Sequence, residues 1–121
     1  MTPGVDLIAL RTRIREFVAA REWDQFHNPK NLTMALVREA SELVEIFQWL
    51  TPEEAASIND DPQQREAVAE ELADCLYYVI RLADRLDIDL GNALLAKLEL
   101  NAAKYPVDSS RGSARKYSRS D

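Results

Sequence analysis

The sequence predicts an all-α protein with a four-helix bundle-type fold. Residues with high helix propensity dominate the 121-residue chain, and only three glycines and five prolines interrupt them. Apolar side chains recur every three or four residues through four segments, as on helices that bury one face. A chain of this length is typical of one domain. We expect that domain at residues 1–106, followed by a flexible, serine- and arginine-rich tail at 107–121.

The first two helices are separated by a polar loop. The first is predicted at about residues 6–21, with Leu10, Ile14 and Phe17 on one face. A turn at Asn28-Pro29 then precedes the second helix, predicted at about residues 32–50.

The third and fourth helices are predicted from their start signals. Thr51 is followed by proline and two glutamates, which is typical of a short helical turn. Asp61 is followed by proline in the same way, and it starts a long helix at about residues 62–86. The fourth helix begins at Asp87 or Asp89 and ends near residues 105–106. The middle of the third helix is apolar around much of its circumference, which favours neighbours on several sides and hence a homo-oligomer.

Composition and charge exclude several classes of protein. The chain is 46% hydrophobic and 30% charged, and its net charge of −6 makes it a poor partner for nucleic acid. We find no apolar run long enough to cross a bilayer and no N-terminal signal peptide. The single cysteine, Cys75, excludes an internal disulfide and fits a reducing compartment. We therefore expect a cytoplasmic protein that binds neither membranes nor nucleic acid.

Two acidic side chains fall on the apolar face of the second predicted helix. Each helical residue turns about 100° from the last, which places Glu39 between Leu32 and Ile46. Glu42 falls about 60° away, at the edge of this face. Glu45 points outward, as a solvated helical glutamate does. An unpaired carboxylate on a buried face is costly, so we expect Glu39 to have a partner.

The third predicted helix repeats this arrangement. Glu71 falls between Cys75 and Tyr78 on the apolar face, and Asp74 lies about 60° away at its edge. Helical residues three positions apart are neighbours, so each acidic pair can hold one ligand. A single pair is usually a solvated helix edge. Two pairs on helices that can pack together favour a shared site.

Four converging carboxylates repel one another and require a neutralising cation. Oxygen ligands select Mg²⁺, with Mn²⁺ as a substitute, over zinc or copper. A di-iron bundle would require Glu-x-x-His pairs, but the only histidine, His27, lies in a loop. A magnesium site leaves positions open for phosphate oxygens and water. The predicted ligands are Glu39, Glu42, Glu71 and Asp74.

Other side chains suit a nucleotide. A polar stripe on the fourth helix can hold phosphates, aromatic side chains beside the second helix can stack on a base, and a basic pair in the tail can close over the phosphates. Each feature also has an ordinary structural alternative, such as core packing or a solvated face. The candidate substrate-binding residues are Trp23, His27, Trp49, Tyr78, Lys97, Asn101, Lys104, Tyr105, Arg115 and Lys116.

Three segments resemble the MazG-like all-α nucleoside triphosphate pyrophosphohydrolases, and most closely the dCTP pyrophosphatase branch. They are REWDQFHNPKNLTMALVREASELVEIFQWL (21–50), EELADCLYYVIRLADRLDIDL (70–90) and KLELNAAKYP (97–106), and the tail segment SARKYS (113–118) is also similar. The resemblance implies Mg²⁺-dependent cleavage between the α and β phosphates. It also implies a dimer or tetramer in which several subunits contribute helices to each site.

Carried over residue by residue, the resemblance implies the same four acids as metal ligands. It places two tryptophans around the base and the polar stripe of the fourth helix near phosphate or sugar. One departure is Arg38, because the broader family often has a glutamate directly before the position of Glu39. The residues implied at the base are Trp23 and Trp49, and those near phosphate or sugar are Lys97, Asn101, Lys104 and Tyr105.

The sequence thus predicts a Mg²⁺-dependent nucleoside triphosphate pyrophosphohydrolase, in which the same four acids serve catalysis. Its products would be a nucleoside monophosphate and pyrophosphate. The substrate, dCTP or a modified dCTP, rests on the resemblance, because an aromatic sandwich accepts any base. One alternative is a pyrophosphohydrolase of the phosphoribosyl-ATP type. Another is a non-enzymatic helical module that binds a metal ion or a nucleotide.

Overall fold

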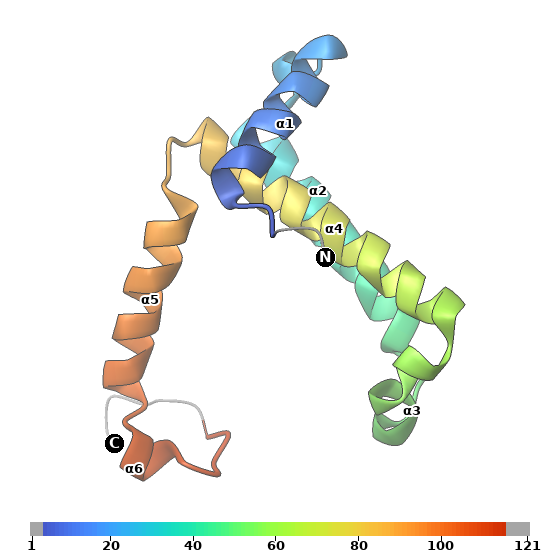
Figure 1. Cartoon of the computed structure of the whole chain (residues 1–121), viewed down its shortest axis with the longest axis vertical. Coiled ribbons are helices and arrows are strands. Elements are labelled where there is room, and N and C mark those ends of the chain that lie inside the picture. The colour runs from blue at the N-terminus through green and yellow to red at the C-terminus, as the bar shows by residue number, and fades with distance from the viewer. Residues whose placement is uncertain (1–3, 116–121) are drawn as a thin grey trace. The chain divides into compact units, whose positions relative to one another are not determined.

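The computed structural model describes residues 4–115, and every regular element in this range is helical (Figure 1). The chain divides into two compact units, Met1–Ile88 and Asp89–Asp121. The all-α prediction is confirmed. The fourth predicted helix belongs to the second unit, whereas the other three long helices belong to the first.

The first unit begins with α1 (Leu7–Ala20), whose N-terminus is capped by Asp6. The Asp6 carboxylate accepts a hydrogen bond of 2.7 Å from the backbone N–H of Ala9. The chain leaves α1 through Glu22, which has a φ of 53°, in the left-handed region. A short 3₁₀ helix, η1 (Asp24–Phe26), follows and leads the chain toward the second long helix.

The second long helix, α2 (Pro29–Phe47), begins three residues before the predicted start and ends three residues before the predicted end. The predicted turn at Asn28 is a helix cap, because its side chain accepts a 2.9 Å hydrogen bond from the backbone N–H of Asn31. Pro29 occupies the first helical position, where a missing N–H costs nothing. Both residues therefore start the helix.

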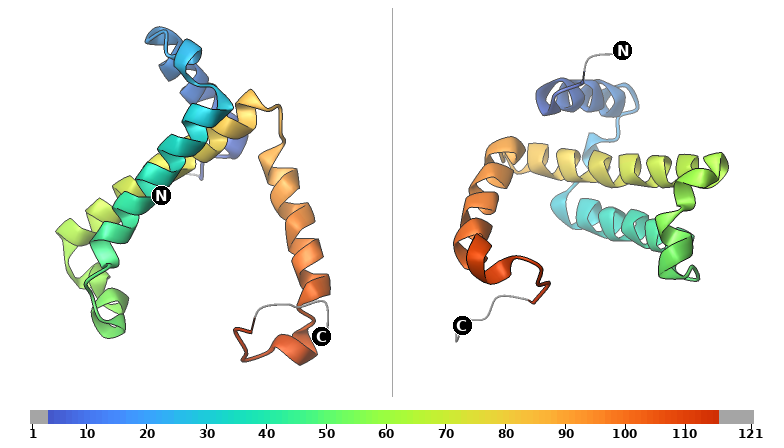
Figure 2. Two further views of the ribbon diagram at one scale, coloured as in Figure 1. Left: turned by 180° about the vertical axis from the view of Figure 1, so that it is seen from behind. Right: turned by 60° about the horizontal axis from the view of Figure 1, so that its bottom comes forward.

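Two short elements link α2 to α4. Thr51 and Glu54 form a reciprocal capping box at the start of α3 (Pro52–Ala56), as the sequence pattern predicts. After η2 (Ile58–Asp60), the Asp61 side chain accepts hydrogen bonds from the first backbone N–H groups of α4 (Pro62–Arg85). The chain thereby reverses, and α4 runs antiparallel to α2 (Figures 1 and 2).

The core of the first unit lies between α2 and α4, which form its main helix pair, while α1 crosses the C-terminal half of α4 (Figure 2). Leu32 of α2 and Val18 of α1 are almost fully buried. Ile80 faces away from Glu71 around α4, yet it is also buried. Neighbours on more than one side of α4 are therefore present within this unit, whereas the apolar character of that helix led us to expect them from other subunits, and the homo-oligomer stays a prediction.

The second unit contains α5 (Leu90–Lys104), capped by Asp89, and the short α6 (Val107–Ser110). Several leucines of α5 are more than half exposed. They are Leu94, Leu95, Leu98 and Leu100. The sequence pattern predicts no helix at α6, because this segment is short and polar.

No helix in residues 4–115 combines the length and the apolar character that crossing a membrane requires.

Candidate metal centre

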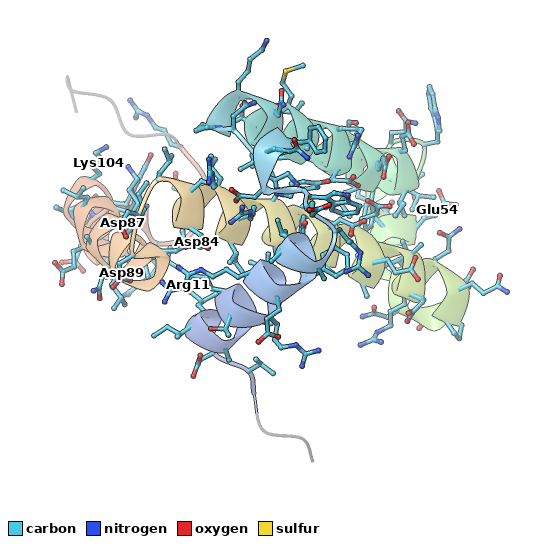
Figure 3. All side chains as sticks on the ribbon, turned by 90° about the horizontal axis from the view of Figure 1, so that it is seen from above. Arg11, Glu54, Asp84, Asp87, Asp89 and Lys104 are labelled. Atoms are coloured by element: carbon cyan, nitrogen blue, oxygen red, sulfur yellow. The ribbon has the colours of Figure 1, made fainter. Side chains whose placement is uncertain are left out.

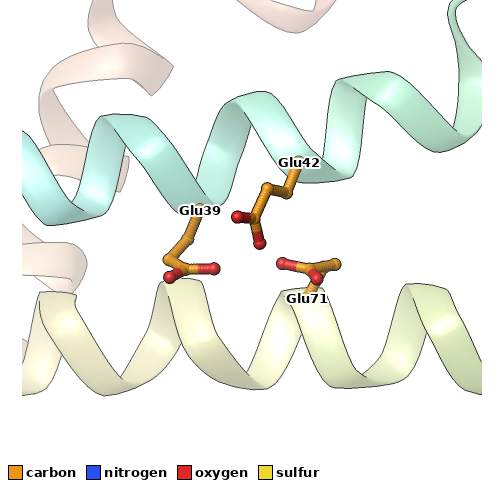
Figure 4. A group of neighbouring side chains, drawn as sticks. All are labelled: Glu39, Glu42 and Glu71. Carbon is orange, nitrogen blue, oxygen red and sulfur yellow. The ribbon is translucent and has the colours of Figure 1, made fainter.

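Three of the four predicted metal ligands meet between α2 and α4. Glu39 and Glu42 project from α2 toward Glu71 of α4 (Figure 4). One carboxylate oxygen from each residue lies within 4.8 Å of the other two. Two oxygens bound to one Mg²⁺ are at most about 4.2 Å apart, so a small side-chain movement would bring all three within the coordination distance of one ion.

The helical period explains why these side chains converge. Leu32, Glu39 and Ile46 recur every seven residues on α2, and the first two are buried. Glu39 has only 8% of its surface exposed, as its place on the apolar face predicts. Glu45 is exposed, also as predicted.

The three carboxylates strongly perturb one another. Burial, followed by the charges of Glu42 and Glu39, raises the pKa of Glu71 to about 7. The pKa of Glu42 is also raised, first by its hydrogen bond with Glu39 and then by the charge of that residue. Such shifts are expected where like charges meet with limited solvation. At neutral pH this cluster therefore shares at least part of a proton.

One carboxylate oxygen of the cluster is direct evidence for cation binding. Glu71 Oε2 is buried and has no hydrogen-bond partner among the described residues. A buried carboxylate oxygen without a partner is costly, and a cation would satisfy it. Three converging oxygen donors, one of them unsatisfied, fit a hard ion such as Mg²⁺ better than a soft metal.

Asp74, the fourth predicted ligand, is not part of this group of three. Its side chain is exposed one turn beyond Glu71 on α4. The pKa of the neighbouring Cys75 thiol is raised by burial and then by the charges of Glu39, Glu71 and Asp74. Asp74 thus acts electrostatically on the same region, and its role as a metal ligand remains a prediction.

An arginine lies at the edge of the cluster. Arg38 Nη2 donates to Glu39 Oε1 over 3.1 Å and to the Tyr78 hydroxyl over 3.4 Å. In the sequence, Arg38 stands out only as a departure from a family pattern. Its position one residue before an inward glutamate, about 100° around the helix, was the available signal for this placement.

Aromatic rings continue from Tyr78 toward the predicted base-binding residues. Tyr78 packs edge-on against Tyr77 at 4.9 Å between ring centroids, and Tyr77 packs against Phe17 at 6.3 Å. Phe17 contacts Trp23 at 5.6 Å, and Trp23 lies 6.5 Å from the ring of His27. A continuous series of ring contacts therefore connects Tyr78 with Trp23 and His27.

A buried arginine holds His27 in place. Arg81 is 5% exposed, and its Nε–H donates to His27 Nδ1 over 3.1 Å. Arg81 also donates to Asp24, as does Arg85 at 3.2 Å. Burial, followed by the charge of Arg81, lowers the pKa of His27, while Asp24 partly opposes this effect. His27 is therefore a neutral imidazole with its proton on Nε2.

A second ion-pair group fixes the crossing of α1 over α4. Arg15 Nε donates to Asp84 Oδ2 over 2.7 Å, and Arg81 Nη1 lies 3.5 Å from the same oxygen. Arg11 and Asp84 lie near this crossing (Figure 3). The hydrogen bond from Arg15 lowers the pKa of Asp84. Sequence periodicity did not reveal these long-range pairs.

The two predicted base-binding tryptophans lie toward opposite ends of α2. Trp23 precedes this helix and is 40% exposed, whereas Trp49 follows it and is 86% exposed. A 19-residue helix is about 28 Å long, which is several times the width of a nucleobase. The two tryptophans of one chain therefore do not flank the same base.

The remaining predicted residues lie in the second unit. Lys97, Asn101 and Lys104 lie on α5, and the backbone N–H of Tyr105 donates to the Asn101 carbonyl at 2.8 Å. The backbone N–H of Arg115 donates to Ser113 Oγ at 3.2 Å. Their roles toward a substrate remain predictions. Lys116, the last predicted residue, lies outside the described residues.

Comparisons with known proteins agree with the resemblance in the sequence. The model of the MazG-like family matches residues 35–119. The chain is 50% identical over 102 residues to dCTP pyrophosphatase 1 of Bos taurus, covering 84% of this chain and 60% of the relative. It is 45% identical over 116 residues to dCTP pyrophosphatase 1 of Rattus norvegicus, covering 96% of this chain and 68% of the relative.

A solved structure is similar as well. A pyrophosphatase from Archaeoglobus fulgidus superimposes with a TM-score of 0.78 and 34% sequence identity. The match covers 88% of this chain and 97% of that protein.

Proposed function

The chain belongs to the MazG-like family, and we propose that it is a Mg²⁺-dependent nucleoside triphosphate pyrophosphohydrolase. The observation that carries this proposal is the convergence of Glu39, Glu42 and Glu71, with one buried Glu71 oxygen that lacks a partner among the described residues. The names of the relatives favour dCTP or a modified dCTP as substrate. The products would be the nucleoside monophosphate and pyrophosphate.

In the proposed site, Mg²⁺ would be held by Glu39, Glu42, Glu71 and Asp74. When bound, the metal supplies charge neutralisation for the triphosphate and polarises its phosphoryl oxygens. One of the glutamates accepts a proton from a water molecule whose oxygen attacks the α-phosphorus. The bond from that phosphorus to the oxygen bridging to the β-phosphate breaks, and pyrophosphate leaves with the bridging oxygen.

The substrate-binding roles follow the side-chain chemistry. Trp23, Trp49 and Tyr78 would contact the base or line its pocket, and His27 would donate through Nε2–H. Basic and polar groups of the second unit would bind phosphate and sugar. They are Lys97, Asn101, Lys104, Tyr105, Arg115 and Lys116.

We also propose that the working enzyme is a homo-oligomer, a dimer or a tetramer. Trp23 and Trp49 of one chain lie too far apart to flank one base, whereas a second copy can supply the missing tryptophan. Leu72 and Leu76 on α4 are 53% and 43% exposed, which is consistent with a further neighbour on that helix.

The test is product analysis with matched glutamine variants. Purified protein is incubated with Mg²⁺ and a panel of canonical and modified dNTPs, NTPs and phosphoribosyl-ATP, and the products are separated by chromatography. Glu39→Gln and Glu71→Gln should each lower kcat at least about 100-fold, because each removes a charged ligand oxygen. Their controls are Glu45→Gln and Glu70→Gln, which change exposed glutamates on the same two helices.

The pattern of products separates the candidate functions. Nucleoside monophosphate and pyrophosphate in equal amounts support the proposal, and the preferred nucleotide identifies the substrate. Turnover of phosphoribosyl-ATP alone would place the chain with that enzyme type instead. Mg²⁺-dependent thermal stability without turnover of any nucleotide would support a non-enzymatic metal-binding module.

A further inference from the structure

Arg38 joins the carboxylate cluster to its surroundings through a contact that is easily broken. Its Nη2 donates to Glu39 Oε1 at 3.1 Å and to the Tyr78 hydroxyl at 3.4 Å. The Arg38 side chain is 61% exposed, whereas that of Glu39 is 10% exposed. The guanidinium therefore approaches the buried carboxylate from the solvent side and keeps most of its own surface in water.

The geometry indicates a weak ion pair. Adjacent residues on a helix do not face each other, so Arg38 reaches Glu39 only by folding its long side chain along α2. Both of these contacts use the same nitrogen, and an exposed guanidinium is screened by solvent. A competing cation can displace Arg38 from Glu39 at little cost.

We propose that Arg38 neutralises Glu39 in the metal-free protein and, once Mg²⁺ occupies Glu39, transfers its guanidinium to the phosphates of the incoming nucleotide. This inference rests on the proposed function. A dication bound at Glu39 repels the guanidinium, while a triphosphate attracts it and matches its planar donor groups. The Tyr78 hydroxyl keeps Arg38 beside the cluster during the exchange. Arg38 is thus a phosphate-binding residue that competes with the metal for one oxygen.

The proposal requires two opposite effects from one substitution. Arg38→Met removes the competing charge, so Mg²⁺ should bind the nucleotide-free protein about two- to fivefold more tightly. The same variant lacks a charged phosphate contact, so it should bind a nucleotide about tenfold more weakly. If Arg38 merely supported the fold, its removal would weaken the binding of both Mg²⁺ and the nucleotide, or of neither. Arg38→Lys keeps the charge but loses the planar guanidinium, and it should fall between wild type and Arg38→Met for the nucleotide.

The measurement is isothermal titration calorimetry on the full chain. Mg²⁺ is titrated alone, and α,β-imido-dCTP, which resists cleavage at the bond in question, is then titrated in saturating Mg²⁺. Arg13→Met is the control, because Arg13 is an exposed arginine of α1 that pairs with Glu16 over 4.0 Å. Circular dichroism and thermal melting of each variant verify that it is folded.

The outcomes separate this inference from the proposed function. Tighter Mg²⁺ binding with weaker analogue binding, in Arg38→Met but not in Arg13→Met, supports the exchange. Unchanged or weaker Mg²⁺ binding overturns the competition, and unchanged analogue binding overturns the phosphate contact. If the wild-type protein binds neither Mg²⁺ nor the analogue, the proposed function fails and the inference fails with it.

Discussion

Arg81 and His27 form a pair that fixes the tautomer of the imidazole. A guanidinium has no acceptor atom, so the 3.1 Å contact from Arg81 Nε requires an unprotonated Nδ1 on His27. The two residues are 54 positions apart in the sequence, and Asp24 and Arg85 complete the charged surroundings. The imidazole can therefore act as a donor through Nε2 without being positively charged.

Acidification should destabilise the protein through His27. Its pKa lies below the ordinary value of 6.5, so the unfolded chain binds a proton more readily than the folded chain. His27 should therefore contribute a fall in melting temperature as the pH drops below about 6.5, measured in saturating Mg²⁺ so that the opposite contribution of the carboxylate cluster is suppressed. His27→Gln, which keeps an acceptor for Arg81 but cannot titrate, should reduce this fall. Melting curves between pH 5 and pH 7 test this expectation, and an identical fall in the variant would contradict it.

In metal-free protein, the carboxylate cluster should make the stability of the fold depend on pH in the opposite direction. The pKa of Glu71 rises from 4.5 to about 7, so between these values the folded chain holds a proton that the unfolded chain has lost. Stability should therefore decrease as the pH rises through this range. Glu71→Gln should flatten the slope, whereas Glu70→Gln, at an exposed position, should not. Thermal melting with a chelator measures the slope, and added Mg²⁺ should reduce it because the metal replaces the proton.

Removal of Arg81 should be costly because the side chain is buried within its ion pairs. Arg81→Leu leaves His27 Nδ1 without its donor and removes one partner from Asp24 and Asp84. We expect a loss of about 2–4 kcal/mol in the free energy of unfolding.

The matched control for that change is Arg85→Leu. The Arg85 side chain is 38% exposed and shares Asp24, so its removal should cost less than about 1 kcal/mol. Urea denaturation of both variants provides the comparison. Equal losses would mean that the burial of Arg81 has no energetic consequence.

The positions of the tryptophans lead to a test by mixed oligomers. If the base pocket combines Trp23 of one subunit with Trp49 of another, Trp23→Ala and Trp49→Ala should each be nearly inactive alone. Co-expression should restore activity to about a quarter of wild type in a dimer, because half of the dimers are mixed and each mixed dimer has one intact pocket. Activity assays of co-purified, differently tagged chains measure the recovery. No recovery would contradict a base pocket shared between two subunits.

The local features of the fold were largely predictable from sequence. Helical period placed Leu32 and Glu39 on the inner face of α2 and Glu45 on the outer face, and all three are found there. The start of α2 differs from the prediction because an Asn-Pro pair can form either a turn or the start of a helix, and here Asn28 caps the helix. Periodicity alone does not distinguish these two uses of Asn-Pro.

The long-range features were not predictable in the same way. Sequence pattern brought Glu39, Glu42 and Glu71 together, but it also placed Asp74 beside them, whereas the structure leaves Asp74 exposed outside the group. The sequence gives no sign of the Arg81 contacts with His27 and Asp24, because these partners lie in a distant segment and the helical wheel carries no information about other elements. Arg81 is buried because α1 packs against α4, and the residue pattern of α4 alone does not indicate this packing.

The surroundings of Cys75 also affect how the protein behaves on the bench. Thiol oxidation and alkylation proceed through the thiolate, and burial and nearby carboxylates raise the pKa of this thiol. The only cysteine of the chain should therefore react slowly in air and with iodoacetamide at neutral pH. Storage without a reductant should not crosslink the chains, so any dimer or tetramer seen by gel filtration would be held together without covalent bonds.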